Sequence, residues 1–134
     1  MFFKKDKSEN NNLSKVAALL IHAAKIDENF SKNEETIIKQ ALLQIGANNE
    51  NLEKIFLDGK KIEENSNQIL EFTKEVKNMG DNDKIKIVET LWRIIYSNKE
   101  ADIYETSLMR RLGGLLYIDS KLMGDIKERI KNKI

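Results

Sequence analysis

The chain has 134 residues, no cysteine and one histidine, and its 23 basic and 22 acidic side chains give a net charge of +1. Without cysteine, disulfides, thiolate nucleophiles and cysteine-ligated metals are excluded, and a single histidine excludes any site that needs two imidazoles. A general nucleic-acid-binding protein is usually far more basic than this chain. We therefore expect a single domain that has no nucleic-acid partner.

The N-terminal residues do not have the pattern of a targeting signal. The basic pair that follows Phe2 and Phe3 is not followed by an apolar stretch, and no segment is long and apolar enough to cross a membrane. These features predict a cytoplasmic protein without an integral membrane segment. The aromatic and basic arm formed by Phe2, Phe3, Lys4 and Lys5 predicts only a weak contact with a membrane surface.

Residues 1–11 are polar after the two phenylalanines and predict a flexible arm, whereas residues 12–134 predict one helical domain. Apolar residues beyond the arm recur with a helical period, and the chain contains no proline. The prediction is an all-α fold of about seven helices, with a break at Gly59 in the third. The expected helices span about 12–26, Ser31 to before Gly46, 49–63, Ser66 to before Gly80, 83–97, Asp102 to Leu116, and Asp119 or Ser120 to Ile130.

The two halves of the domain resemble each other at an offset of 71 residues, which places Leu20 on Leu91 and Glu34 on Glu105. Each repeat, about 13–52 and 84–123, contains an apolar helix, a short polar turn and a second helix. Two such helical hairpins can bury their apolar faces against each other. The repeat therefore predicts two duplicated hairpins related by a pseudo-twofold axis.

Two segments at matched spacing resemble the signatures of the TerB-like family. The first is Val-Ala-Ala-Leu-Leu-Ile-His-Ala-Ala-Lys-Ile-Asp at 16–27, followed by Phe30 and Glu34. The second is Ile-Val-Glu-Thr-Leu-Trp at 87–92, followed by Tyr96, Glu105 and Leu-Met-Arg-Arg-Leu-Gly-Gly-Leu-Leu-Tyr at 108–117. Over residues 13–131 the chain is similar to the small stand-alone bacterial members of this family, which is named for tellurite resistance and includes the N-terminal region of the DjlA co-chaperones.

The resemblance implies an all-helical domain with an internal duplication and no established enzymatic activity. Because the sequence also contains no recognisable catalytic constellation, we expect an interaction domain rather than an enzyme. The implied role is to dock a protein partner, of unknown identity, in a metal or oxyanion stress response. No cofactor is required for such a role.

Acidic residues in the turns between the paired helices suggest an alternative function, the binding of a divalent cation such as Ca²⁺ or Mg²⁺. Carboxylate and amide oxygens are the ligands that these ions prefer. The family usually has Ala-Asp-Gly in each turn; the first turn here keeps only the aspartate and the second has lost both it and the glycine. The candidate ligands are Asp27, Glu28, Glu34, Asn98 and Glu105.

The same residues also fit purely structural roles. Glu34 and Glu105 occupy the third position of a helix, where a glutamate completes a capping box and interacts favourably with the helix dipole. Asp27 and Asn98 suit turns because their side chains hydrogen-bond to nearby backbone groups. The sequence leaves both interpretations open.

Four further features have candidate roles. His22 lies on the polar strip of its helix and predicts a surface or helix-interface histidine. Trp92 predicts core packing, with an aromatic floor for a ligand as the alternative. Arg110 and its basic neighbour predict a solvated face, and the pair formed by Gly113 and Gly114 predicts a close helix approach or a kink rather than a phosphate loop.

Overall fold

The protein is all-α. The computed structural model describes the backbone of residues 2–25, 32–65, 70–96 and 103–133, and the side chains of 13–25, 32–65, 72–96 and 107–133. This part of the chain forms seven helices and no strand, which confirms the predicted fold class. The helices are α1 (Phe2–Ala24), α2 (Lys32–Ile45), α3 (Leu52–Glu64), α4 (Leu70–Lys77), α5 (Asp81–Tyr96), α6 (Ile103–Leu115) and α7 (Ser120–Lys133).

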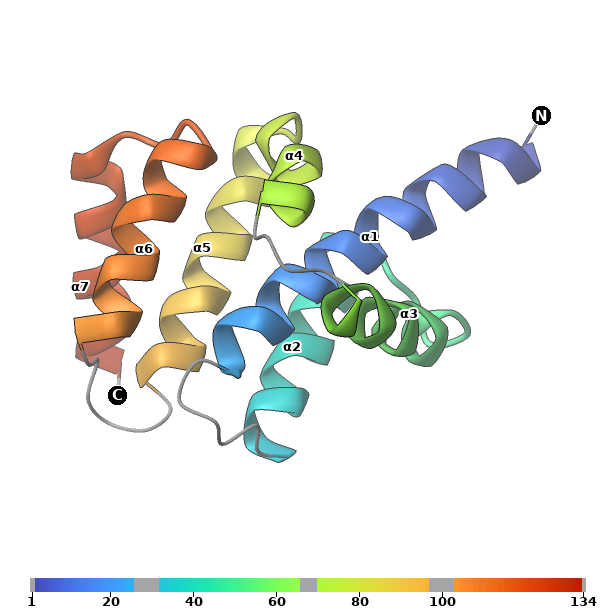
Figure 1. Ribbon diagram of the computed structural model, residues 1–134, viewed down its shortest axis with the longest axis horizontal. Coiled ribbons are helices and arrows are strands. Elements are labelled where there is room, and N and C mark those ends of the chain that lie inside the picture. Colours follow the sequence, from blue (N-terminus) through green and yellow to red (C-terminus); the bar gives the residue numbers. More distant parts are fainter. Residues whose placement is uncertain (1, 26–31, 66–69, 97–102, 134) are drawn as a thin grey trace.

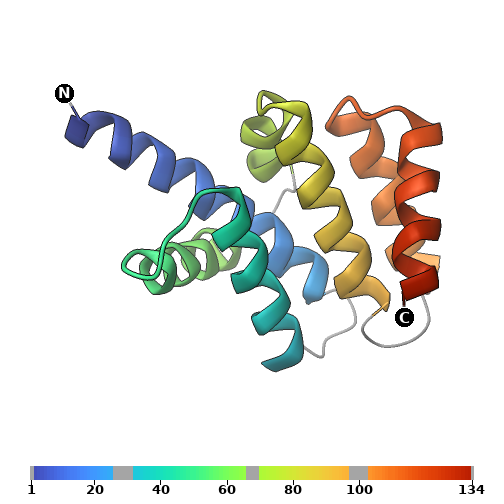
Figure 2. The same ribbon diagram turned by 180° about the vertical axis from the view of Figure 1, so that it is seen from behind.

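The helices form two groups that meet along α1 and α5. At one end of the molecule α1 packs most extensively on α3 and also contacts α2 and α4. At the other end α5, α6 and α7 stand side by side, with α7 packed on α5 (Figures 1 and 2). The two groups are joined by contacts of α5 with α1 and α2 and of α4 with α6.

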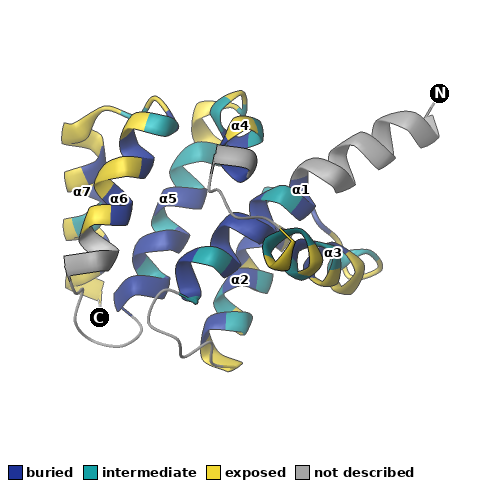
Figure 3. Cartoon of the chain, viewed as in Figure 1, coloured by how far each residue is buried: buried dark blue, intermediate teal, exposed yellow. Residues whose placement is uncertain are grey.

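The core lies where these groups meet, and α1 and α5 supply most of it. Figure 3 shows their mutually facing surfaces as buried, whereas the outer faces of α3 and α7 are exposed. Both central helices are apolar around most of their circumference, as expected for elements covered on several sides. The largest fully buried side chains are Phe56, Phe72, Leu19, Leu20, Ile21, Ile38, Leu42, Ile55, Ile87, Leu91, Ile94 and Ile95.

Two helix predictions are wrong. The first helix begins at Phe2 rather than near residue 12, so residues 2–11 belong to α1. No glycine or proline interrupts this segment, and extending a formed helix is far easier than nucleating a new one. The flexibility expected of residues 1–11 stays a prediction.

The break expected at Gly59 does not occur. This residue lies in the middle of the continuous helix α3 and is buried. Its missing side chain lets α3 lie directly against α1. A Cβ atom at this position would be 2.6 Å from Ala17 Cβ and 3.0 Å from the backbone oxygen of Ser14. Close helix packing therefore explains the glycine that the sequence pattern suggested as a breaker.

The hairpins predicted by the repeat correspond to α1–α2 and α5–α6. The first ends as predicted at Gly46, whose φ of 147° is readily adopted only by glycine. The pseudo-twofold relation between the hairpins stays a prediction.

Candidate functional site

Most of the predicted cation ligands lie outside the described residues. These are Asp27, Glu28, Asn98 and the side chain of Glu105, whose backbone belongs to α6. Glu34 is described; it lies in the first turn of α2 and is only 1% exposed. No group of three acidic or histidine side chains within the described part of the chain is arranged to hold a metal ion. The cation site as a whole therefore stays a prediction.

His22 is an interface histidine, as predicted. Its Nδ1 atom lies 3.4 Å from Glu63 Oε2, which places the imidazole between α1 and α3. The same carboxylate accepts a hydrogen bond of 2.7 Å from Lys25 Nζ. These contacts join the end of α1 to α3.

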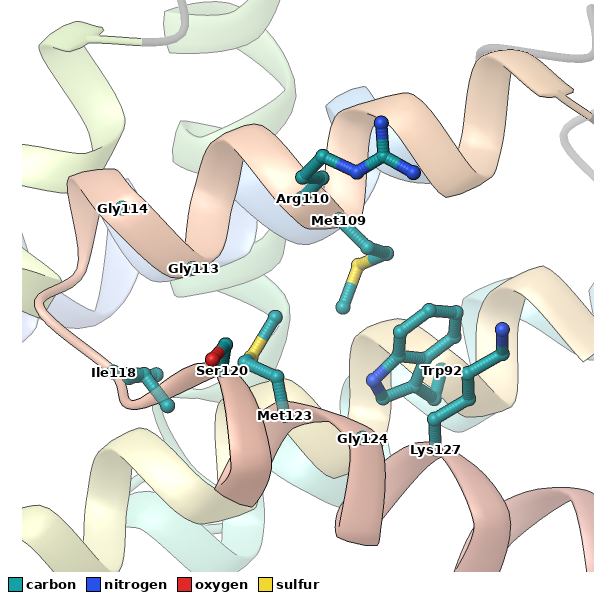
Figure 4. A pocket seen from close by; sticks show the side chains of 10 residues that line it. All are labelled: Trp92, Met109, Arg110, Gly113, Gly114, Ile118, Ser120, Met123, Gly124 and Lys127. Atoms are coloured by element: carbon teal, nitrogen blue, oxygen red, sulfur yellow. The ribbon is translucent and has the colours of Figure 1, made fainter.

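A cleft lies among α5, α6 and α7. It has a volume of about 410 Å³, within the usual range for ligand sites. Figure 4 shows side chains from all three helices converging on it. The cleft is lined by Trp92 of α5, by Met109, Arg110, Gly113 and Gly114 of α6, by Ile118, and by Ser120, Met123, Gly124 and Lys127 of α7.

The end of α6 is closed by a Schellman motif that positions Ile118 at the cleft. The amide of Ile118 donates to the carbonyl of Gly113 at 2.9 Å, and the amide of Tyr117 donates to that of Gly114 at 3.3 Å. Tyr117 takes the left-handed position, with a φ of 56°, which is usually occupied by glycine. This reversal returns the chain along α7, so that α6 and α7 form opposite walls.

Trp92 forms the floor of the cleft. It is 4% exposed, and its ring stacks on that of Tyr96 with centroids 5.9 Å apart. Lys127 Nζ lies 5.5 Å from the indole centroid, within the range of a cation–π contact. Burial, followed by the negative charge of Glu128, raises the pKa of Tyr96 above its ordinary value. The tyrosine is therefore a neutral stacking partner at physiological pH.

The indole nitrogen of Trp92 is buried and has no hydrogen-bond partner in the structure as described. Leaving a buried donor unsatisfied costs about 1–3 kcal/mol, so most such groups in native proteins are paired. Figure 4 shows this nitrogen on the side of the ring that faces Met123. The free protein thus carries an unused donor next to a flexible side chain.

Charge at the cleft is of one sign. Arg110 and Lys127 lie at the same end of it (Figure 4), and no acidic side chain lines it within the described residues. Met109 and Met123 cover much of the remaining wall. An apolar wall with a few convergent polar groups is the usual form of a ligand-binding site.

The sequence singles out some of the residues that line this cleft, but it does not predict that they come together. The predicted core packing of Trp92 is confirmed by its burial, and the alternative role as an aromatic floor for a ligand stays a prediction. A Cβ atom at Gly113 would lie 3.4 Å from Met123 Cγ, about an ordinary contact distance, so the close helix approach expected of the glycine pair stays a prediction. Gly114 faces open space. The helical glycine pair was the available signal for a groove.

The described residues form an all-helical domain with a cleft among three of its helices. A family model described as tellurite resistance protein TerB matches residues 13–128, and the chain therefore belongs to the TerB family. Neither the curated proteins nor the solved structures include a significant match to the chain. Within the described residues, none of the helices combines the length and apolar character needed to traverse a bilayer.

Proposed function

We propose that this chain is a non-catalytic TerB interaction domain that docks a protein partner in a metal or oxyanion stress response. The observation that carries the proposal is the cleft among α5, α6 and α7, which combines an apolar wall, a buried aromatic floor and basic side chains. Interfaces obtain most of their affinity from such buried aromatic and arginine positions. Membership of a family of generally non-catalytic domains supports the same function.

Filling the cleft tests this proposal. Gly124 is exposed, and a Cβ atom there would meet nothing within 4 Å, so Gly124→Phe adds a ring to the cleft without a clash in the core. Gly80 is equally exposed and open but precedes α5, outside the cleft, which makes Gly80→Phe the matched control.

We expect a partner to be captured from cells by the wild-type chain and by Gly80→Phe, and to be lost at least about tenfold with Gly124→Phe. Capture is compared with and without tellurite, and the recovered protein is purified and its binding remeasured in solution. Equal recovery by the two variants, or no recovery above an unrelated helical domain in either condition, would overturn the proposal.

A second candidate function is the binding of a divalent cation, which prefers the carboxylate and amide oxygens that the inter-helix turns supply. Glu34 lies in the first turn of α2, and α2 begins directly after the segment that carries Asp27 and Glu28. In this function Glu34, Asp27 and Glu28 bind Ca²⁺ or Mg²⁺, with Asn98 and Glu105 as the corresponding residues of the second hairpin.

Cation binding predicts a metal-dependent rise in stability. An ion at 100 times its dissociation constant adds about 2.7 kcal/mol, which corresponds to a rise of several degrees in Tm for a domain of this size. The measurement is thermal unfolding in EDTA against millimolar Ca²⁺, Mg²⁺ and Mn²⁺, with Glu34→Ala/Glu105→Ala alongside. A rise that disappears in the double variant supports cation binding. Equal destabilisation of the variant in every buffer assigns these glutamates to the helix N-termini instead.

A further inference from the structure

The unpaired indole donor of Trp92 indicates what the cleft is built to receive. An acceptor that reaches Nε1 would remove the cost of leaving this buried N–H unsatisfied. Nε1 has no solvent-exposed surface of its own, so an incoming acceptor must displace a neighbouring side chain. Met123 lies on that side of the ring and is flexible enough to move.

The basic side chains of the cleft, Arg110 and Lys127, indicate that its ligand also carries a negatively charged group. Arg110 is exposed and has no ion-pair partner among the described residues, and Lys127 projects beside the indole ring. Because no described acidic side chain lines the cleft, the complement to these basic side chains is a carboxylate. The ligand must therefore carry a negative charge at one end and an uncharged acceptor further inside.

The walls favour an extended peptide over a compact molecule. Gly114 on α6 and Gly124 on α7 leave open space where side chains would otherwise stand, so a backbone can approach both helices closely. Met109 and Met123 line the cleft although they are only 1% and 8% exposed, and their flexible side chains can shift to admit an apolar group of a peptide. A peptide supplies all three groups at once: a backbone carbonyl, an apolar side chain and an acidic side chain.

We infer that the cleft among α5, α6 and α7 docks an acidic peptide segment of the protein partner. One backbone carbonyl of the segment accepts from Trp92 Nε1, an apolar side chain packs between Met109 and Met123, and a carboxylate meets Arg110 and Lys127. This inference rests on the proposed function as a docking domain, and it specifies the chemistry of the docked segment.

A random heptapeptide display library, selected on the wild-type chain and counter-selected on Gly124→Phe, tests the inference. We expect the enriched peptides to combine carboxylates with an apolar residue. One enriched peptide is then synthesised, and its binding to the wild-type chain is followed through the fluorescence of Trp92, the only tryptophan in the chain. Its binding to the variants is measured by calorimetry.

Charge and donor variants then separate the groups. Arg110→Glu/Lys127→Glu should weaken binding at least about tenfold, whereas Lys54→Glu/Lys61→Glu, the same charge change on α3, should change it less than about twofold. Trp92→Phe should weaken binding about fivefold, as expected for the loss of one net hydrogen bond. Higher salt should reduce affinity for the wild type more than for the Arg110/Lys127 variant.

The inference fails if the library yields no peptide that depends on the cleft, if basic or uncharged peptides are enriched, or if charge reversal has no effect. Octanoate that gives the same saturable fluorescence change at similar affinity would assign the cleft to a small amphipathic carboxylate. Self-association that Gly124→Phe abolishes would assign it to a second copy of the chain. If acidic peptides fail but partner capture from cells still depends on Gly124, the docking function stands and only the peptide chemistry is wrong.

Discussion

Replacing Phe56 by alanine is expected to lower the free energy of unfolding by about 3–5 kcal/mol. Phe56 is only 1% exposed in α3 and is among the largest fully buried side chains of the protein. Truncation removes its apolar surface and leaves a cavity between α3 and its neighbours, which relax only partly. It also removes the contact with Lys39 of α2, whose Nζ lies 4.9 Å from the ring centroid.

The next residue in α3 provides the control. Leu57 is 52% exposed, so Leu57→Ala should change stability by no more than about 0.5 kcal/mol. Urea and thermal unfolding of both variants give the comparison. If Phe56→Ala is unfolded at the working temperature, Phe56→Leu provides a milder substitution that should remain folded and show a smaller loss of stability. Similar losses at the two positions would mean that the inner face of α3 is placed wrongly.

The helices could be predicted from the sequence because their signals are local. The apolar spacing of α2, α5 and α7 identifies each helix and its buried face without reference to any other part of the chain. The start of α1 could not be predicted in the same way. Its first turns carry no apolar stripe, and only continuity with the strongly apolar segment that follows makes them helical.

The cleft could be predicted only in part, because it depends on which helix faces meet. Trp92, Met109 and Met123 come from three helices, and each fits an ordinary core pattern within its own segment. Periodicity cannot determine that these faces diverge and leave a space between them. The unused donor of Trp92 is likewise a property of the assembled fold, since it depends on what surrounds the indole ring.

A glycine in a helix lowers stability through its poor helix propensity, but it can raise stability where it lets two helices pack closely. Replacing each of two glycines by alanine should therefore change the free energy of unfolding in opposite directions. We expect Gly59→Ala to destabilise the protein by about 1–3 kcal/mol, although alanine is the better helix former. An added Cβ atom would be 2.6 Å from Ala17 Cβ, and it would also lie 3.0 Å and 3.1 Å from backbone atoms of Ser14 and Ala18. The backbone of α1 cannot change position locally as a flexible side chain can. In the alanine variant α3 must therefore move away from α1.

Gly124→Ala is the matched substitution in α7, where the added Cβ atom meets nothing within 4 Å. Here the intrinsic preference of alanine for a helix acts alone, and the variant should be more stable than the wild type by about 0.5–1 kcal/mol. Chemical unfolding of both variants checks the opposite signs. Stabilisation by both substitutions would contradict the close packing of α1 on α3. An interface that had room for a methyl group would not need a glycine at position 59.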